Sequence, residues 1–159
     1  NQDRPIKVLS DVDSALKEER ARLKEEGFFD KDNIGEFYGI FETRAYIQNM
    51  YHLAHMYANA GMIKRSIDVA REVIRLNEND NTGVRYLLMG LYAYLEDGAN
   101  LKKHYKKIGE ENLHSLLPML IYYFKQCNYK EADKYLGKIK NVINILKKYL
   151  IVMLSKKMI

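Results

Sequence analysis

The sequence of 159 residues is 47% hydrophobic and 30% charged, which is typical of a globular protein and excludes a disordered chain. Its formal net charge of +5 is divided unevenly: residues 1–80 hold 12 Lys and Arg against 15 Asp and Glu, whereas residues 81–159 hold 14 against 6. The single cysteine, Cys127, excludes an internal disulfide and indicates a reducing compartment, so we expect a soluble, cytoplasmic protein.

The first expected element is a charged helix that ends near Glu26. Ser10 is its expected N-cap, and Gly27 is its expected C′ residue, a position that glycine often occupies. Seven of the nine residues from Glu18 to Glu26 are charged, so much of this helix should face water. Residues 28–40 should be irregular. Four aromatic side chains are expected to hold this segment: Phe28, Phe29, Phe37 and Tyr38.

Two amphipathic helices joined by a short turn at Gly61 form the clearest pair in the sequence. Apolar residues recur at spacings of three and four on each side of this glycine, which gives each helix one apolar stripe. The stripes are Ile47, Met50, Ala54, Tyr57 and Ala58 in the first helix, and Ile63, Ile67, Ala70, Val73 and Ile74 in the second. Because the connection is short, the two helices should form an antiparallel hairpin.

The remaining chain also has a helical pattern. Asn81 is the expected N-cap of the next helix. Proline is tolerated in the first turn of a helix, so the helix that contains Pro118 should begin near Ser115. We expect helices over residues 83–95, 101–108, 113–126, 130–139 and 142–154.

The helix pairs repeat along the chain, with the second set of matching residues 35 positions after the first and the third 31 positions later. The three sets are Met50, Leu53, Ala54, Tyr57, Ser66, Ala70 and Val73; Leu88, Met89, Tyr92, Leu101, Tyr105 and Ile108; and Met119, Leu120, Tyr123, Ala132, Leu136 and Ile139. A pattern of this length resembles the tetratricopeptide repeat, in which small residues on the second helix permit close packing.

This resemblance implies an all-α fold that forms a tetratricopeptide-like right-handed superhelix of antiparallel helix hairpins. Residues 1–159 would then be a single domain. We expect an N-terminal helix and irregular lead-in over residues 1–44, three degenerate hairpin repeats over residues 45–139, and an apolar terminal helix over residues 140–159.

A narrower resemblance is to a group of uncharacterised bacterial tetratricopeptide proteins. It rests on GEFYGIFETRAYIQ at residues 35–48 and LNENDNTGVRYLL at residues 76–88. The two stretches contain a polar cluster, with Thr43 as a further candidate N-cap. The cluster is either a ligand or anion site or a hydrogen-bonded clasp between hairpins, and we interpret it as a clasp because no nucleophile or phosphate-binding glycine loop accompanies it. Its members are Glu42, Arg44, Asp80, Asn81 and Arg85.

The first helices of stacked tetratricopeptide hairpins line a concave face, so the resemblance implies a partner-binding surface there. The expected contact residues are Gln48, Tyr51, His55, Asn59, Tyr86, Tyr94, His114 and Lys125. The alternative for Tyr86 and Tyr94 is that they pack against a neighbouring hairpin. We therefore predict a protein–protein interaction scaffold that binds a polypeptide, and not an enzyme, because no catalytic motif is found.

Neither a metal ion nor a cofactor is expected. His52 and His55 lie one helical turn apart, but a zinc site needs three or four protein ligands, and no neighbouring carboxylate or cysteine completes the set. The alternative function is an adaptor or regulator that contacts nucleic acid through the lysine-rich C-terminal half. Solvated lysines are the simpler interpretation, because only Arg85 represents arginine after residue 80.

The terminal helix is apolar around most of its circumference. Its longest apolar run, Tyr149 to Leu154, is far shorter than the ~20 residues of a membrane span. We expect this helix to form a homodimer or to pack into a groove of its own chain; a covering segment outside this sequence and attachment to a membrane surface are further alternatives.

Overall fold

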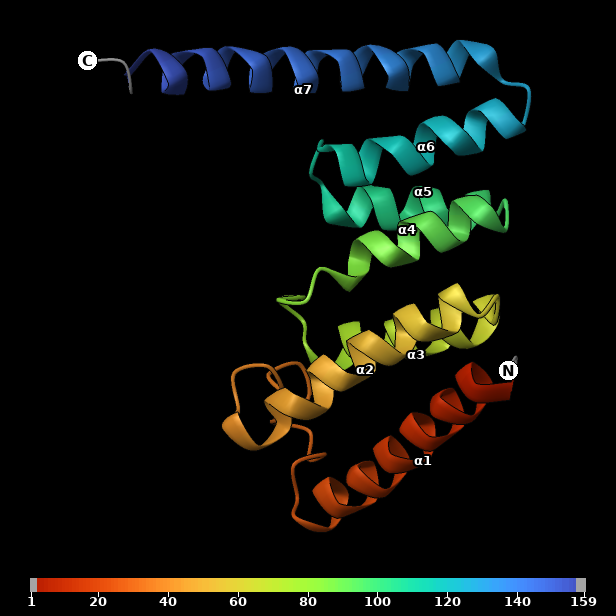
Figure 1. The fold of residues 1–159 in the computed structure, drawn as a ribbon, viewed down its shortest axis with the longest axis vertical. Helices are drawn as coiled ribbons and strands as arrows, with labels where there is room; N and C mark the ends of the chain where they lie inside the picture. Colours follow the sequence, from red (N-terminus) through yellow and green to blue (C-terminus); the bar gives the residue numbers. More distant parts are fainter. Residues whose placement is uncertain (1–2, 157–159) are drawn as a thin grey trace. The chain divides into compact units, whose positions relative to one another are not determined.

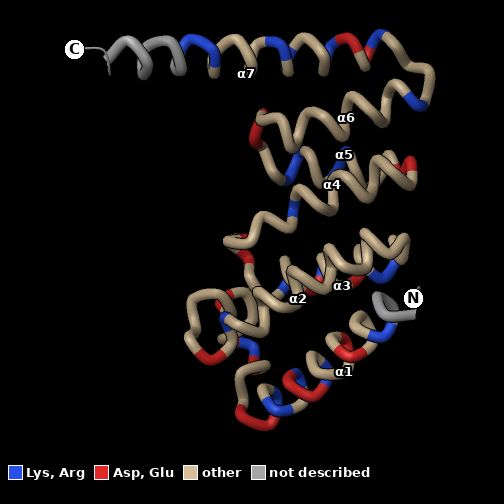
Figure 2. Tube along the Cα trace, in the orientation of Figure 1, with Lys and Arg blue, Asp and Glu red and all other residues tan. Residues whose placement is uncertain are grey.

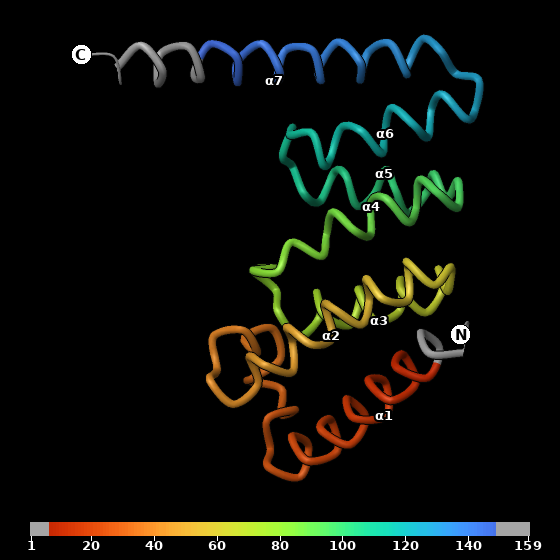
Figure 3. Tube along the Cα trace, in the orientation of Figure 1, coloured from red at the N-terminus to blue at the C-terminus, as the bar shows by residue number. Residues whose placement is uncertain are grey.

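The computed structural model of the chain describes the backbone of residues 3–156 and the side chains of residues 7–148 (Figure 3). This part of the chain is all-helical and contains no strand, only two isolated bridges of Asn77 with Gly35 and Glu36, which confirms the predicted all-α class. No described helix is both long and apolar enough to cross a membrane. The helices are α1 (Asp3–Glu25), α2 (Phe41–Asn59), α3 (Ile63–Leu76), α4 (Val84–Tyr94), α5 (Gly98–Ile108), α6 (Leu113–Lys125) and α7 (Tyr129–Lys156) (Figure 1).

The chain divides into two compact units, Asn1–Leu91 and Tyr92–Ile159, which we call the N-terminal unit and the C-terminal unit. The boundary lies within α4. Segments of three residues join α2 to α3, α4 to α5, and α6 to α7, so the helices follow each other along the chain in three pairs. The sequence also predicted a right-handed superhelix and a single domain. Both depend on how the pairs are arranged, and both stay predictions.

α1 begins earlier than expected and ends as expected. Ser10 lies inside the helix, so the prediction that it is the N-cap was wrong; the apolar stripe of α1 already includes the buried Leu9. Gly27 is the C′ residue, with a positive φ of 81° that glycine adopts at no steric cost. The amides of Gly27 and Phe28 donate to the carbonyls of Lys24 and Leu23, which is the Schellman pattern.

α2 is the central helix of the N-terminal unit and packs against both α1 and α3 (Figure 1). Ala54 on α2 and Ala70 on α3 are fully buried, and their small side chains let the two helices approach closely. At the same interface the buried hydroxyl of Ser66 donates a 2.7 Å hydrogen bond to the carbonyl of Ala54. The hairpin predicted around Gly61 is therefore packed through the small residues that the sequence pattern had singled out.

In the C-terminal unit, α6 packs against α5 and α7. The stacked rings of Tyr123 and Tyr135, 5.6 Å apart, form part of the contact between α6 and α7. Asn112 caps α6, because its side chain accepts from the Ser115 amide while the Ser115 hydroxyl accepts from the Asn112 amide. This capping box starts α6 at Leu113, as in the expected range of 113–126 and two residues before the start that Pro118 had suggested. Pro118 therefore lies beyond the first turn of the helix.

α7 is one continuous helix of 28 residues, whereas the sequence pattern had predicted separate helices over residues 130–139 and 142–154. The intervening Lys140 and Asn141 are exposed and neither is a glycine or proline, so the helix continues through them. Ile145 and Leu146 are 53% and 55% exposed, so this portion does not pack into its own chain as one alternative proposed. The side chains of residues 149–154, on which the prediction also rested, lie outside the described residues.

Gly98 provides a test of the packing between α5 and α6. An added Cβ at Gly98 would overlap the hydroxyl and ring of Tyr122, so Gly98→Ala must displace this half-buried ring. We expect the free energy of unfolding to fall by about 1–3 kcal/mol, as for other overpacked sites. Chemical denaturation of the parent and the variant measures this change.

The matched control is Gly137→Ala on α7, where an added Cβ meets nothing within 4 Å. It should raise stability by about 1 kcal/mol, because alanine is the better helix former. In a Tyr122→Leu background the penalty at Gly98 should largely disappear; equal penalties in both backgrounds would show that Tyr122 is not the obstacle.

Candidate functional site

The two sequence stretches that carry the narrower resemblance meet in space within the N-terminal unit. The Phe37 amide donates to the Leu76 carbonyl at 3.0 Å, and the Glu78 amide donates to the Gly35 carbonyl at 2.8 Å. The Phe37 side chain is fully buried, and Gly35 has a φ of 104° that other residues rarely adopt. We call residues 35–37 and 76–78 the motif junction. It fixes the loop before α2 to the C-terminal end of α3.

Side chains from the start of α2 hold the loop of the motif junction. The buried Thr43 hydroxyl donates a 2.6 Å hydrogen bond to the Phe37 carbonyl. Thr43 is therefore inside the first turn and is not the N-cap as predicted; Ile40 occupies that position without a side-chain cap. The Arg44 guanidinium donates to the carbonyls of Tyr38 and Gly39 at 2.8 and 3.3 Å.

Asp80 organises the other side of the junction, between α3 and α4. Its carboxylate accepts from the amides of Val84 and Arg85, the first two residues of α4, at 2.9 and 3.0 Å. It also forms a 3.0 Å ion pair with the Arg85 guanidinium. α4 begins at Val84, three residues after Asn81, so the prediction that Asn81 is the N-cap of this helix was wrong. Asp80 caps the start of α4 instead, and its backbone has a positive φ of 45°.

The predicted polar cluster thus falls into two groups of contacts. Asp80 and Arg85 are brought together by an ion pair, while Arg44 binds backbone carbonyls of its own loop. Glu42 and Asn81 are exposed. The bonds between these two regions that the structure shows are made by the backbone of the motif junction. Such contacts are those expected of the predicted clasp, which stays a prediction.

The four partner-binding positions predicted on α2 lie on its outer side. Gln48 and Asn59 are exposed, and Tyr51 and His55 are half-buried. The Tyr51 ring contacts the His55 ring edge-on at 4.6 Å. Burial, followed by the charge of His52, lowers the pKa of His55, so its imidazole is neutral over a wider pH range. We call these four residues the α2 face. It presents a small aromatic cluster between two amide side chains.

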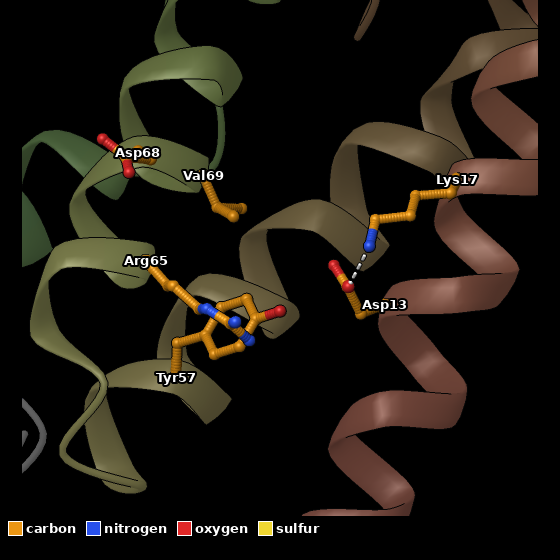
Figure 4. A pocket seen from close by; sticks show the side chains of 6 residues that line it. All are labelled: Asp13, Lys17, Tyr57, Arg65, Asp68 and Val69. Atoms are coloured by element: carbon orange, nitrogen blue, oxygen red, sulfur yellow. Dashed lines mark ion pairs between the residues drawn. The ribbon is translucent and has the colours of Figure 1, made fainter.

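A polar pocket of about 320 Å³ lies between α1, α2 and α3 (Figure 4). Asp13 and Lys17 form a 2.7 Å ion pair across its α1 side, and the Arg65 guanidinium lies 5.8 Å from the centre of the Tyr57 ring. Asp68 and Val69 complete the lining. The lining contains two carboxylates and two cations, so its formal charge is zero.

Asp13 and Lys17 of this pocket are paired with each other. Burial raises the pKa of Asp13, but hydrogen bonding to Lys17 and Tyr57 and the charges of Lys17 and Arg65 outweigh it, and the pKa is lowered. Burial and the Asp13 carboxylate raise the pKa of the Tyr57 hydroxyl. Asp13 is therefore a stable carboxylate and Tyr57 a neutral phenol near pH 7.

Metal binding finds no support in the described side chains. Among residues 7–148 no group of three or more His, Cys, Asp or Glu side chains is arranged to hold a metal ion. Cys127 is exposed at the turn between α6 and α7.

The remaining predicted partner-binding residues are distributed over both units. Lys125 Nζ donates to the Tyr94 carbonyl at 3.1 Å and forms a 2.9 Å ion pair with Glu96, so these positions are brought together. Tyr94 and His114 are exposed. Tyr86 is half-buried with its ring 4.6 Å from the Arg85 guanidinium. This contact lies within α4, so the alternative that Tyr86 packs against a neighbouring hairpin stays a prediction.

The prediction missed an exposed apolar surface on α6 in the C-terminal unit. Leu113, Leu117, Ile121 and Phe124 of α6 are 37%, 48%, 44% and 61% exposed. Their spacing of four, four and three residues places them on one side of the helix, and we call them the α6 face. The sequence of α6, LHSLLPMLIYYFK, contained a signal for this surface, because its apolar residues surround the helix. Such a helix exposes apolar side chains unless other elements cover every side of it.

A scan against protein-family models, a search of curated proteins and a search of solved structures each gave no match to this chain.

Asp80 and Asn81 form a matched pair for testing the motif junction. Asp80→Ala removes two bonds to helix amides and an ion pair, so it should lower the free energy of unfolding by about 1–3 kcal/mol. Asn81→Ala removes an exposed side chain and should change it by less than about 0.5 kcal/mol. Denaturation of both variants measures the difference; a larger loss for Asn81→Ala would contradict this assignment of the cap.

Proposed function

We propose that the chain is a protein–protein interaction scaffold that binds a polypeptide on the exposed faces of the first helices of its pairs. The observation that carries the proposal is the α6 face, where four large apolar side chains remain exposed on one helix. Contiguous exposed apolar surface on a folded protein marks a binding site more often than isolated exposed residues do.

The α2 face supports the same function from the other unit. Tyr51 and His55 form an aromatic contact that is only partly covered. A tyrosine ring provides a rigid contact area and a hydroxyl that tolerates water, and for this reason tyrosine is enriched among residues that dominate binding energy.

A nucleic-acid adaptor is the second candidate, favoured by the lysines of the C-terminal unit (Figure 2). Residues 92–159 contain 13 Lys and 6 Asp and Glu, which suits an anionic partner. They contain no arginine, although arginine is prominent in sites that recognise nucleic acids. Binding of generic DNA or RNA that falls steeply with salt would favour this candidate over the scaffold.

The α2 face is tested with a partner identified by affinity capture and mass spectrometry. Tyr51→Ala combined with His55→Ala should weaken binding of the purified partner by roughly 1–3 kcal/mol, the usual cost of losing interface anchors. The melting temperature should stay close to that of the parent, because both side chains lie at the surface. Calorimetric titration provides the affinity.

Lys64→Ala, an exposed position on α3, is the control and should leave the affinity unchanged. Unchanged affinity for the double variant would place the binding surface elsewhere on the scaffold. A chain that captures no protein and binds only nucleic acid would contradict the proposed function itself.

A further inference from the structure

The α6 face is an apolar helix surface that stays exposed among the described residues. The opposite side of α6, which includes Ser115, Leu116 and Met119, is buried, and α5 and α7 pack against this helix. The α6 face remains open beside them. Phe124 also contacts the exposed Tyr129 edge-on at 5.7 Å, which extends the apolar surface to the start of α7.

The form of this surface favours a helix as its occupant. From Leu113 to Phe124 the helix rises by about 16 Å, or three turns, at 1.5 Å per residue. Large side chains at a spacing of three and four form a ridge that fits between the side-chain rows of another helix. A peptide that adds as a β-strand would need unpaired backbone donors and acceptors along the site, and the side of an α-helix offers none. An amphipathic helix needs only an apolar stripe of matching length.

The charge of the C-terminal unit indicates the polarity of that helix. Its 13 lysines outnumber its 6 acidic residues by seven, and it has no arginine. Three ion pairs already occupy Glu96, Glu111 and Glu131. On α5, which packs against α6, four lysines are exposed: Lys102, Lys103, Lys106 and Lys107. This excess attracts an acidic partner and disfavours a second copy of the same unit.

We propose that the α6 face binds an amphipathic α-helix of a partner protein, whose apolar stripe packs on Leu117 and Ile121 and whose flanking positions are acidic. The proposal rests on the proposed function and specifies its ligand. Phe124 and Tyr129 form the aromatic end of the contact. Lys125 lies beside them, already held by Glu96 at 2.9 Å, so the more distant lysines supply the long-range attraction.

The probe is a fluorescent synthetic peptide of about 20 residues, long enough to form a helix, with leucines on one helical face and glutamates elsewhere. Its binding to the intact chain is measured by fluorescence anisotropy. We expect saturable binding that weakens as salt rises, because the attraction is screened. Leu117→Gln combined with Ile121→Gln should weaken it by about tenfold or more. Val8→Gln, at an exposed apolar position on α1, is the matched control and should have no effect.

Two further peptides separate apolar packing from charge alone. One has the same composition with the leucines scattered around the helix, and the other has lysine in place of every glutamate. Both should bind at least about tenfold more weakly than the probe if the apolar stripe and the acidic flanks each contribute. Equal binding of either peptide would overturn the proposal.

Other occupants give distinct results. If phosphatidylserine vesicles capture the chain and the peptide does not bind, the α6 face is a membrane contact. If the chain forms a dimer that Leu117→Gln and Ile121→Gln dissociate, the α6 face is a self-contact. Either result overturns the proposal. A captured protein that binds the α6 variant as tightly as the parent would overturn it too, while the scaffold function stands. Binding of neither peptide nor any cellular protein would contradict the function itself.

Discussion

Buried backbone groups must be hydrogen-bonded, and this constraint decides how the N-terminal unit is built. The irregular segment before α2 buries Phe37, so its amide and carbonyl need partners inside the protein. The Leu76 carbonyl accepts from the amide, and the Thr43 hydroxyl donates to the carbonyl. Gly35 and Glu78 complete the motif junction. These bonds hold the loop against the C-terminal end of α3, and the position of the loop sets the direction in which α2 begins.

The same constraint explains residues that would otherwise suggest chemistry. Asp80 and Arg85 form an ion pair of the kind that often marks a ligand site, yet the carboxylate is engaged by two amides at the start of α4. Arg44 binds two carbonyls of the loop. These contacts are those expected of a clasp, and whether the cluster also binds a ligand stays open.

The sequence predicted the helices well because helical spacing of apolar residues is a local property. The pair around Gly61 and the C′ role of Gly27 follow from such patterns. Caps were harder to predict, because Ser10, Thr43 and Asn81 all have suitable side chains and the choice depends on tertiary context. The buried Leu9 extends the apolar stripe of α1 past Ser10. The Thr43 hydroxyl donates to the Phe37 carbonyl instead of capping α2. At the start of α4 the amide of Val84 donates to Asp80 and not to Asn81.

Exposure was the property least accessible from sequence. The positions predicted on the α2 face are at the surface, but the open side of α6 was missed because Leu113, Leu117, Ile121 and Phe124 look like core residues. Which side of an apolar helix stays uncovered depends on how many neighbours pack against it. For α7 the continuity through Lys140 was likewise missed, since exposed polar residues can continue a helix as well as end one.

Hydrogen exchange at the motif junction tests most directly whether the two resembling stretches are a structural joint. Measured by NMR on the intact chain, the amides of Phe37 and Glu78 should exchange about as slowly as a core amide of α2 such as that of Ile47, because both are hydrogen-bonded across the junction. If the amides of Phe37 and Glu78 exchange at the rate of an exposed loop while that of Ile47 stays protected, the structural joint is contradicted. The two stretches would then be candidates for a ligand-binding loop again.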